Sequence, residues 1–203
     1  MDAGVSAARV DVARGFRSEL RTLRADVGAD YDAILEAQAK YRGEARRAPL
    51  LVAMVQKIGL QMMVSYRVMR FFRAIGWTFV AKVLSRRIRR AYGAEIHWDT
   101  ELAPGVMIVH GTGLVLSHAA RVGPRCILFQ HVTLGVNIDP TTRETGAPML
   151  EANVHVGPGA VLLGPIVIGA GTKITANAVL THSVPPNSRV ITPEPIIHRL
   201  VVE

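Results

Sequence analysis

Aliphatic residues recur every six positions through the second half of the chain. A six-residue period fits neither the 3.6-residue period of an α-helix nor the two-residue alternation of a β-strand. Thirteen aliphatic residues hold this frame: Ile96, Leu102, Ile108, Leu114, Val122, Leu128, Leu134, Leu150, Val156, Leu162, Ile168, Ile174 and Leu180. The period predicts a parallel β-helix over residues 92–191, in which each short strand turns one aliphatic side chain inward.

Two interruptions break the six-residue frame. The first is a slip of two residues between Leu114 and Val122, which we assign to 120–121, where a turn can absorb it. The second is the polar stretch VNIDPTTRETGAPM at 136–149. Long polar loops that leave a regular scaffold commonly carry binding residues, so we expect 136–149 to protrude and to serve in binding.

The first half of the chain has the period of α-helices. Residues 13–28 place apolar side chains on one side and charged side chains on the other, and residues 30–47 carry Ile34 and Leu35 followed by polar residues. Gly28 is expected to stop the first of these helices, and Asp30 stands where an N-cap of the second would be.

The following stretch, 48–92, is apolar with basic residues at helical spacing, and Gly59 and Gly76 are expected to divide it into helical segments. The predicted fold class is therefore α+β. Its parts are a basic α-helical region at 1–91, the β-helix at 92–191 with its protruding loop, and a C-terminal tail at 192–203.

Charge is distributed unevenly between the two halves. Residues 1–90 contain 18 Lys and Arg against 8 Asp and Glu, whereas 91–203 contain 6 against 8. The basic helices leave two alternatives open. They pack against partner subunits with their Arg stems along apolar surface, or they make peripheral contact with a membrane surface. No nucleic-acid-binding motif accompanies the charge, so no nucleic-acid partner is expected.

The sequence predicts a cytoplasmic protein. No stretch of the apolar region is long enough to span a bilayer, and the N-terminus lacks the apolar segment of a secretory signal. The single cysteine, Cys126, excludes an intrachain disulfide and fits a reducing compartment.

Three stretches of the second half resemble a known family. They are GAEIHWDTELAPGVMIVHGTGLVL, ILFQHVTLG and VHVGPGAVLLGPIVIGAGTKITANAVLTHSVPP. Their order and spacing resemble the serine acetyltransferases, a branch of the hexapeptide-repeat acyltransferases. The resemblance implies a left-handed β-helix and direct acetyl transfer from acetyl-CoA to an acceptor hydroxyl.

Two residues in these motifs are candidates for the chemistry. Glu95 directly precedes Ile96 of the frame and His110 follows Ile108 by two residues, so both fall near adjacent turns of neighbouring strands. A histidine at a turn is by itself more often solvated than catalytic. The resemblance implies that His110 is the general base for the acceptor hydroxyl and that Glu95 orients its ring.

The resemblance also implies a binding site for acetyl-CoA as co-substrate. The implied contacts are Gly135, Pro158, Lys173 and Ala176. Lys173 would supply a positive charge for a CoA phosphate. Because this family works as trimers with grooves between subunits, a homotrimer is expected, with pairing into hexamers through the helical region as a further option.

The loop departs from the family pattern. Where the family carries Arg-His-Pro, this chain has Gly146, Ala147 and Pro148, so the side chains that hold the amino acid are absent. We expect Arg143 and Ala147 to lie at the acceptor site. This departure predicts an acceptor other than free L-serine, such as a sugar or specialised-metabolite hydroxyl. The alternatives are a genuine serine O-acetyltransferase of cysteine biosynthesis, or a catalytically silent β-helix that scaffolds a partner enzyme.

The other histidines of the β-helix are interpreted as structural. His97, His118, His131 and His155 lack the close spacing of the zinc ligands in the β-helical carbonic anhydrases. No metal is therefore expected.

Overall fold

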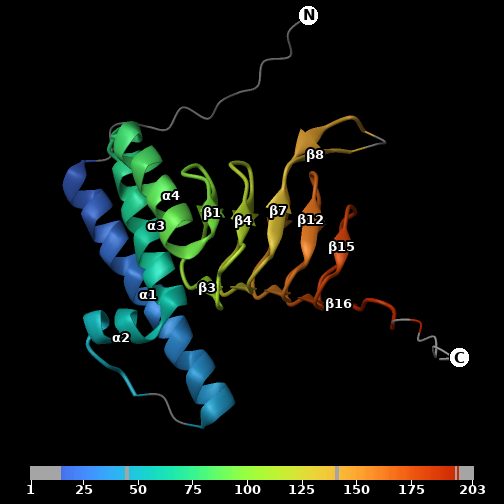
Figure 1. Cartoon of the computed structure of the whole chain (residues 1–203), viewed down its shortest axis with the longest axis horizontal. Helices are drawn as coiled ribbons and strands as arrows, with labels where there is room; N and C mark the ends of the chain where they lie inside the picture. The colour runs from blue at the N-terminus through green and yellow to red at the C-terminus, as the bar shows by residue number, and fades with distance from the viewer. Residues whose placement is uncertain (1–14, 44–45, 140–141, 195, 197–203) are drawn as a thin grey trace, which may run out of the picture.

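The computed structural model describes residues 15–43, 46–139, 142–194 and 196. Within them, four helices pack at one end of a stack of short strands (Figure 1). The helices are α1 (Phe16–Arg42), α2 (Leu50–Gln56), α3 (Ile58–Ala74) and α4 (Thr78–Tyr92). α3 contacts β3 and α4 contacts β1, so the helical region closes the N-terminal end of the β structure.

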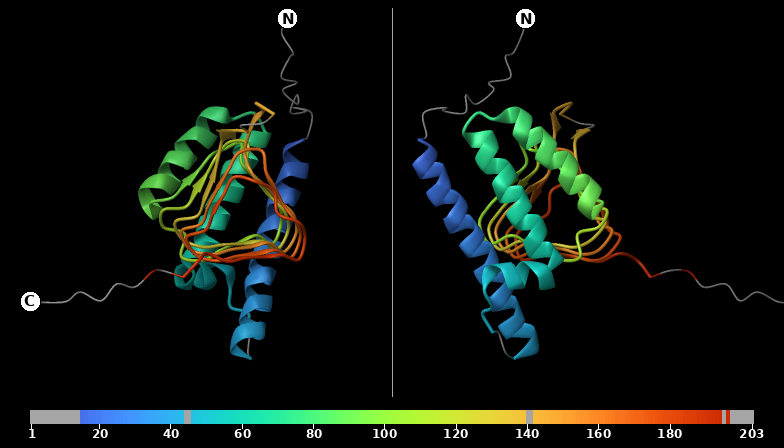
Figure 2. Two further views of the ribbon diagram at one scale, coloured as in Figure 1. Left: turned by 90° about the vertical axis from the view of Figure 1, so that its right-hand side faces the viewer. Right: turned by 60° about the vertical axis from the view of Figure 1, so that its left-hand side comes forward.

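The strands form three parallel sheets that enclose a triangular prism (Figure 2). Sheet A contains β1 (Glu95–Ile96), β4 (Val115–Leu116), β7 (Thr133–Gly135), β12 (Val161–Leu163) and β15 (Val179–Leu180). Sheet B contains β2 (Glu101–Leu102), β5 (Arg121–Val122), β10 (Met149–Leu150) and β13 (Val167–Ile168). Sheet C contains β3 (Met107–Ile108), β6 (Ile127–Leu128), β11 (His155–Val156), β14 (Lys173–Ile174) and β16 (Arg189–Val190).

The chain passes through sheets A, B and C in turn, and each such circuit is called a coil below. The predicted left-handed parallel β-helix, preceded by helices, is confirmed. At the predicted insertion, β8 (Asn137–Ile138) and β9 (Thr145–Gly146) form an antiparallel pair that projects from the prism (Figure 1). Met149, the last residue of the predicted insertion, already belongs to sheet B together with Leu150.

The core consists of inward aliphatic ladders. In sheet A, Ile96, Leu116, Leu134, Leu162 and Leu180 are stacked in register and are at most 4% exposed. Each strand contributes one such side chain, and burial of aliphatic surface favours folding by about 25 cal/mol per Å². The ladder explains how a chain with few aromatic residues builds a continuous core.

The two-residue slip lies elsewhere than predicted. Leu116 takes the strand position, because it pairs in register with Ile96. Leu114 is also fully buried, but it precedes the strand. Two buried leucines two residues apart satisfy the period equally, so the sequence pattern could not choose between them. The extra residues belong to the turn 109–114 between β3 and β4 rather than to 120–121.

The predicted break between the first two helices is wrong, because α1 continues through Gly28. Asp30 caps no helix. Its carboxylate accepts hydrogen bonds from Arg67 Nε and Nη2 at 2.8 and 2.9 Å and from the backbone N–H of Gly105 at 2.9 Å. Arg67 lies 37 positions further along the chain, so no local pattern reports this contact.

The apolar stretch divides at two points. The predicted break at Gly76 separates α3 from α4. The other break falls at Lys57, and Gly59 lies inside the first turn of α3. A Cβ on Gly59 would overlap the carbonyl oxygen of Ile108, so the glycine allows α3 to approach the first coil closely.

No helix in the described ranges is both long and apolar enough to cross a membrane. α4 buries Ala81, Ser85 and Ile88, while Phe79 is 77% exposed and Trp77, just before the helix, 59%. Lys82, Arg86, Arg87, Arg89 and Arg90 are also exposed. This outer face suits subunit packing or an anionic surface, and the two predicted alternatives stay open.

Candidate active site

The corner between sheets C and A has the same backbone conformation in successive coils. Gly113, His131, Gly159 and Asn177 all have φ between 57° and 71°, in the left-handed region. Backbone hydrogen bonds join neighbouring coils here, such as His131 N–H to Thr112 O at 2.9 Å. This corner, called the C–A corner below, therefore repeats the same turn from coil to coil, and a turn of different length is easily recognised.

The departure is the widened turn at 109–114. Its two extra residues bring His110 to φ 65° and Gly111 to φ 72°, and the Gly111 N–H donates to Val109 O at 2.8 Å. His131 has a similar φ at the regular corner, so the two inserted residues, and not the φ value, distinguish His110. A Cβ on Gly111 would overlap Met62 Sδ, so the turn rests directly on α3. The turn therefore holds the His110 backbone firmly while its side chain is exposed.

Glu95 begins β1 close to this turn. Its backbone N–H donates to Leu114 O at 2.7 Å, and the N–H of Gly113 donates to Gly93 O at 2.8 Å, so Glu95 and the widened turn adjoin. Its Oε2 lies 3.2 Å from Arg89 Nη1 of α4. No hydrogen bond between the Glu95 and His110 side chains is present in the described part of the chain.

Three of the four implied acetyl-CoA residues lie at or beside the C–A corner. Pro158 and Ala176 are in its later coils, where the Asn177 N–H donates to Pro158 O at 2.8 Å. Lys173 is exposed on β14, in sheet C, shortly before the corner. Among the described residues no carboxylate lies within ion-pair distance of it.

Arg189 is a candidate that the sequence analysis did not identify. It lies on β16 in register with Lys173, so two cationic side chains share neighbouring strands. Like charges directly opposite one another destabilise a sheet unless an anion binds between them. Arg189 follows Lys173 by 16 positions, whereas Lys173 follows its other strand partner, His155, by 18. A fixed spacing between coils therefore does not predict that Arg189 pairs with Lys173.

The other predicted site residues lie at the opposite end of sheet A, at the corner with sheet B. Gly135 ends β7, and a Cβ there would come 2.6 Å from Leu163 Cδ2. Arg143 is exposed in the projecting hairpin with φ 62°. Ala147 is half-buried and packs against the core at the base of the hairpin.

One chain therefore presents the predicted site in two parts. His131 at the C–A corner and Gly135 are four residues apart along one strand direction, which corresponds to about 13 Å at 3.3 Å per residue. Glu95, His110, Pro158, Lys173 and Ala176 form one part, and Gly135, Arg143 and Ala147 form the other.

The remaining histidines show structural contacts. His97 packs on Trp98 and lies edge-to-face with His118, with ring centroids 3.8 and 5.6 Å apart. Burial lowers the pKa of His97, while the Asp99 carboxylate opposes that shift. Burial and then Lys173 lower the pKa of His155, which stacks on Phe129.

Within the described ranges no three His, Cys, Asp or Glu side chains gather to hold a metal ion.

Cys126 is fully buried, and burial raises its pKa to about 11, so it remains a core thiol.

Comparison with known proteins assigns the family. Residues 148–182 match the family model "Bacterial transferase hexapeptide (six repeats)". Serine acetyltransferase of Synechococcus elongatus is 36% identical over 144 residues, which are 70% of this chain and 57% of that protein. Serine acetyltransferase of Helicobacter pylori is 33% identical over 135 residues, covering 66% of this chain and 77% of that protein. The chain belongs to the serine acetyltransferase family.

Solved structures of serine acetyltransferases have the same fold. Isoform 3 of Entamoeba histolytica, in complex with cysteine, superposes with a TM-score of 0.74 at 28% identity, over 93% of this chain and 64% of that one. The enzyme of Neisseria gonorrhoeae, in complex with serine, gives 0.72 at 26% identity, over 88% and 72%. The chain spans about half the length of the first curated serine acetyltransferases that it matches.

Proposed function

We propose that this chain is an acetyl-CoA-dependent serine O-acetyltransferase. The observation that carries the proposal is the widened turn. In a member of the serine acetyltransferase family, two extra residues expose a histidine at an otherwise regular corner, beside the strand that Glu95 begins. A catalytically silent scaffold would not require these two extra residues at the corner.

In the proposed reaction, His110 accepts the proton of the serine hydroxyl as the hydroxyl oxygen attacks the thioester carbonyl carbon of acetyl-CoA. The C–S bond then breaks, and His110 returns the proton to the departing sulfur. The products are O-acetylserine and CoA with a free thiol. Glu95 would hold the ring and stabilise the imidazolium. Because Arg89 engages Oε2 of Glu95, Oε1 remains for His110.

The residues at the C–A corner fit an extended anionic co-substrate. Pro158 and Ala176 have short side chains on the column, which leaves room for a pantetheine arm. Lys173 and Arg189 offer paired positive charge to the phosphates of CoA, and Arg is well suited to bidentate phosphate binding.

The division of the site into two parts supports a homotrimer. If the corner that carries Arg143 and Ala147 in one subunit abutted the C–A corner of the next, each groove would receive both parts. The same groove would then bring the acceptor to His110 and acetyl-CoA to Lys173.

L-Serine is the proposed acceptor, in place of the sugar or specialised-metabolite hydroxyl predicted from the sequence. The names of the relatives support serine and do not support the earlier prediction. The missing family arginine has a local reason, because a Cβ on Gly146 would lie only 2.8 Å from Pro165 Cβ. Arg143, three residues earlier, would supply the guanidinium for the serine carboxylate.

A thiol-release assay with acetyl-CoA and a panel of acceptors tests this proposal. We expect L-serine to be turned over faster than sugars. Arg143→Gln should raise the KM for L-serine by about tenfold or more, because a charge-assisted hydrogen bond contributes about 1.5–3 kcal/mol. Arg125→Gln, which removes an exposed ion pair with Glu36, is the matched control. A sugar acetylated faster than L-serine contradicts the acceptor, and no CoA release with any acceptor favours the scaffold.

Calorimetry of CoA binding tests the cationic pair separately from turnover. Lys173→Gln and Arg189→Gln should each weaken binding by about tenfold, the effect of losing one charge-assisted phosphate contact. Arg125→Gln, in an exposed ion pair with Glu36, should leave it unchanged. Unchanged affinity in both test variants would remove the pair from the CoA site.

A further inference from the structure

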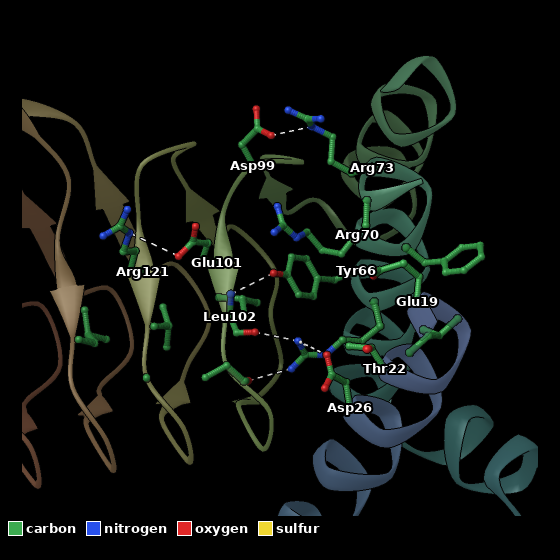
Figure 3. A pocket seen from close by; sticks show the side chains of 18 of the residues that line it. Glu19, Thr22, Asp26, Tyr66, Arg70, Arg73, Asp99, Glu101, Leu102 and Arg121 are labelled. Atoms are coloured by element: carbon green, nitrogen blue, oxygen red, sulfur yellow. Dashed lines mark hydrogen bonds and ion pairs between the residues drawn. The ribbon is translucent and has the colours of Figure 1, made fainter. Parts of the chain in front are cut away.

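A cavity lies away from the proposed active site. It has a volume of about 640 Å³, is open to solvent on one side, and is lined by α1, α3 and the outer face of sheet B (Figure 3). This volume is typical of small-molecule sites, which range from about 300 to 1,000 Å³. His110 lies at the corner between the other two sheets, so the cavity belongs to a different side of the prism.

Three arginines of α3 line this cavity. Arg67, Arg70 and Arg73 follow one another at intervals of three, which places them on one helix face where like charges repel. Two of them are neutralised by carboxylates. Arg67 binds Asp30 at 2.8 Å, and Arg73 Nε lies 2.8 Å from Asp99 Oδ1.

Arg70 differs from its two neighbours. Its only hydrogen bond in the described structure runs from Nη1 to the carbonyl oxygen of Trp98, at 3.0 Å. Within the described ranges, no carboxylate comes within ion-pair distance of this guanidinium. A guanidinium has five N–H donors, and the Arg70 side chain is half-buried, so most of its donors have no protein acceptor within the described ranges. Figure 3 shows its head between α3 and the strands, below the Arg73–Asp99 pair.

The other polar groups near Arg70 are already engaged. Tyr66 Oη donates to Thr100 O and accepts from Leu102 N–H, both at 2.9 Å. Arg121 lies 3.4 Å from Glu101 in a pair whose side chains are 65% and 58% exposed, and Figure 3 shows both on the strands facing α3. Asp99 and Glu101 pair with Arg73 and Arg121, and Asp26 lies 3.3 Å from Arg67. The buried Glu19 also lines the cavity, but among the described residues Arg70 is the lining arginine with no carboxylate at ion-pair distance.

We propose that this cavity binds a small organic anion whose carboxylate or phosphate group pairs with the Arg70 guanidinium. The fork of N–H donors that Trp98 leaves open matches the two oxygens of such a group. Phe71, Ala74 and Met149 supply apolar lining for the remainder of the ligand. This site is separate from acetyl transfer and does not depend on the proposed function.

Trp98 fluorescence provides the test, because the carbonyl of Trp98 contacts Arg70. The chain has two tryptophans, so Trp77→Phe leaves Trp98 as the only reporter. This variant is titrated without acetyl-CoA against inorganic phosphate and against malonate, at constant ionic strength maintained with chloride. We expect a saturable fluorescence change with at least one probe, and the stronger probe identifies phosphate or carboxylate as the preferred group.

Arg70→Gln in the Trp77→Phe background should weaken that binding by about tenfold or more, since a charge-assisted contact is lost. Arg70→Lys, which keeps the charge without the fork, should give intermediate affinity and guards against a folding defect in the Gln variant. Arg125→Gln, on an exposed pair outside the cavity, should match the parent. Responses equal to that of chloride, or a saturable response that survives Arg70→Gln, overturn the proposal.

Discussion

Replacement of His110 by asparagine is expected to lower the kcat of acetyl transfer by about 10²–10⁴-fold, the usual contribution of a general base. Asparagine is chosen because it tolerates the left-handed conformation at φ 65°, whereas alanine there would add backbone strain. The KM for acetyl-CoA should change little, since the proposed acetyl-CoA contacts are other residues. Steady-state thiol release with saturating L-serine measures both parameters.

His118→Asn is the matched control for this prediction. His118 is exposed on the same β-helix but lies outside the widened turn. We expect it to retain the parent kcat within a small factor. Equal losses in the two variants would indicate a general effect of histidine removal, and an active His110→Asn would exclude His110 as the base.

Replacement of Arg67 by leucine is expected to lower the free energy of unfolding by about 3–5 kcal/mol, because it leaves a buried carboxylate without its partner. The Arg67 and Asp30 side chains are only 4% and 1% exposed. Arg67 also donates to Leu102 O at 2.7 Å and Ala103 O at 2.8 Å, so it joins α1 and α3 to the first coil. Urea denaturation at one fixed protein concentration measures the loss.

Two further variants identify the cause of that loss. Arg47→Leu removes an ion pair with Asp32 whose side chains are 62% and 53% exposed, and it should cost at most about 1 kcal/mol. Arg67→Leu combined with Asp30→Leu should be more stable than Arg67→Leu alone, because no unpaired charge remains. A single variant as stable as the parent would show that the pair contributes nothing to docking the helices on the β-helix.

The sequence predicted the β-helix well because its signal is local and repeated. Each coil needs inward aliphatic residues at the same spacing. A wrong assignment at one position therefore leaves the predicted fold unchanged, because the other positions still show the period. The helical region was predicted less well. Gly28 suggested a stop from local propensity, but packing against α3 and the Arg67–Asp30 pair holds α1 together across it.

The candidate site illustrates the same division. Its candidate residues, His110 among them, were proposed from the sequence. Arg189 was not predicted because it follows Lys173 by 16 residues, whereas Lys173 follows His155 by 18. Arg70 was not predicted because its contacts depend on α3, the turn after β1 and sheet B, which come together only in the folded chain.

The sequence by itself determined the six-residue frame, the α+β organisation, the projecting insertion and the motifs of the acetyltransferase family. Only the tertiary structure decided which of two buried leucines takes the strand position, and with that choice it assigned the two extra residues to the turn of His110. It also decided that the predicted site residues occupy two corners of one prism. The physical reason is that periodic burial acts within a few residues, whereas strand register and buried ion pairs depend on segments that meet only when the chain has folded.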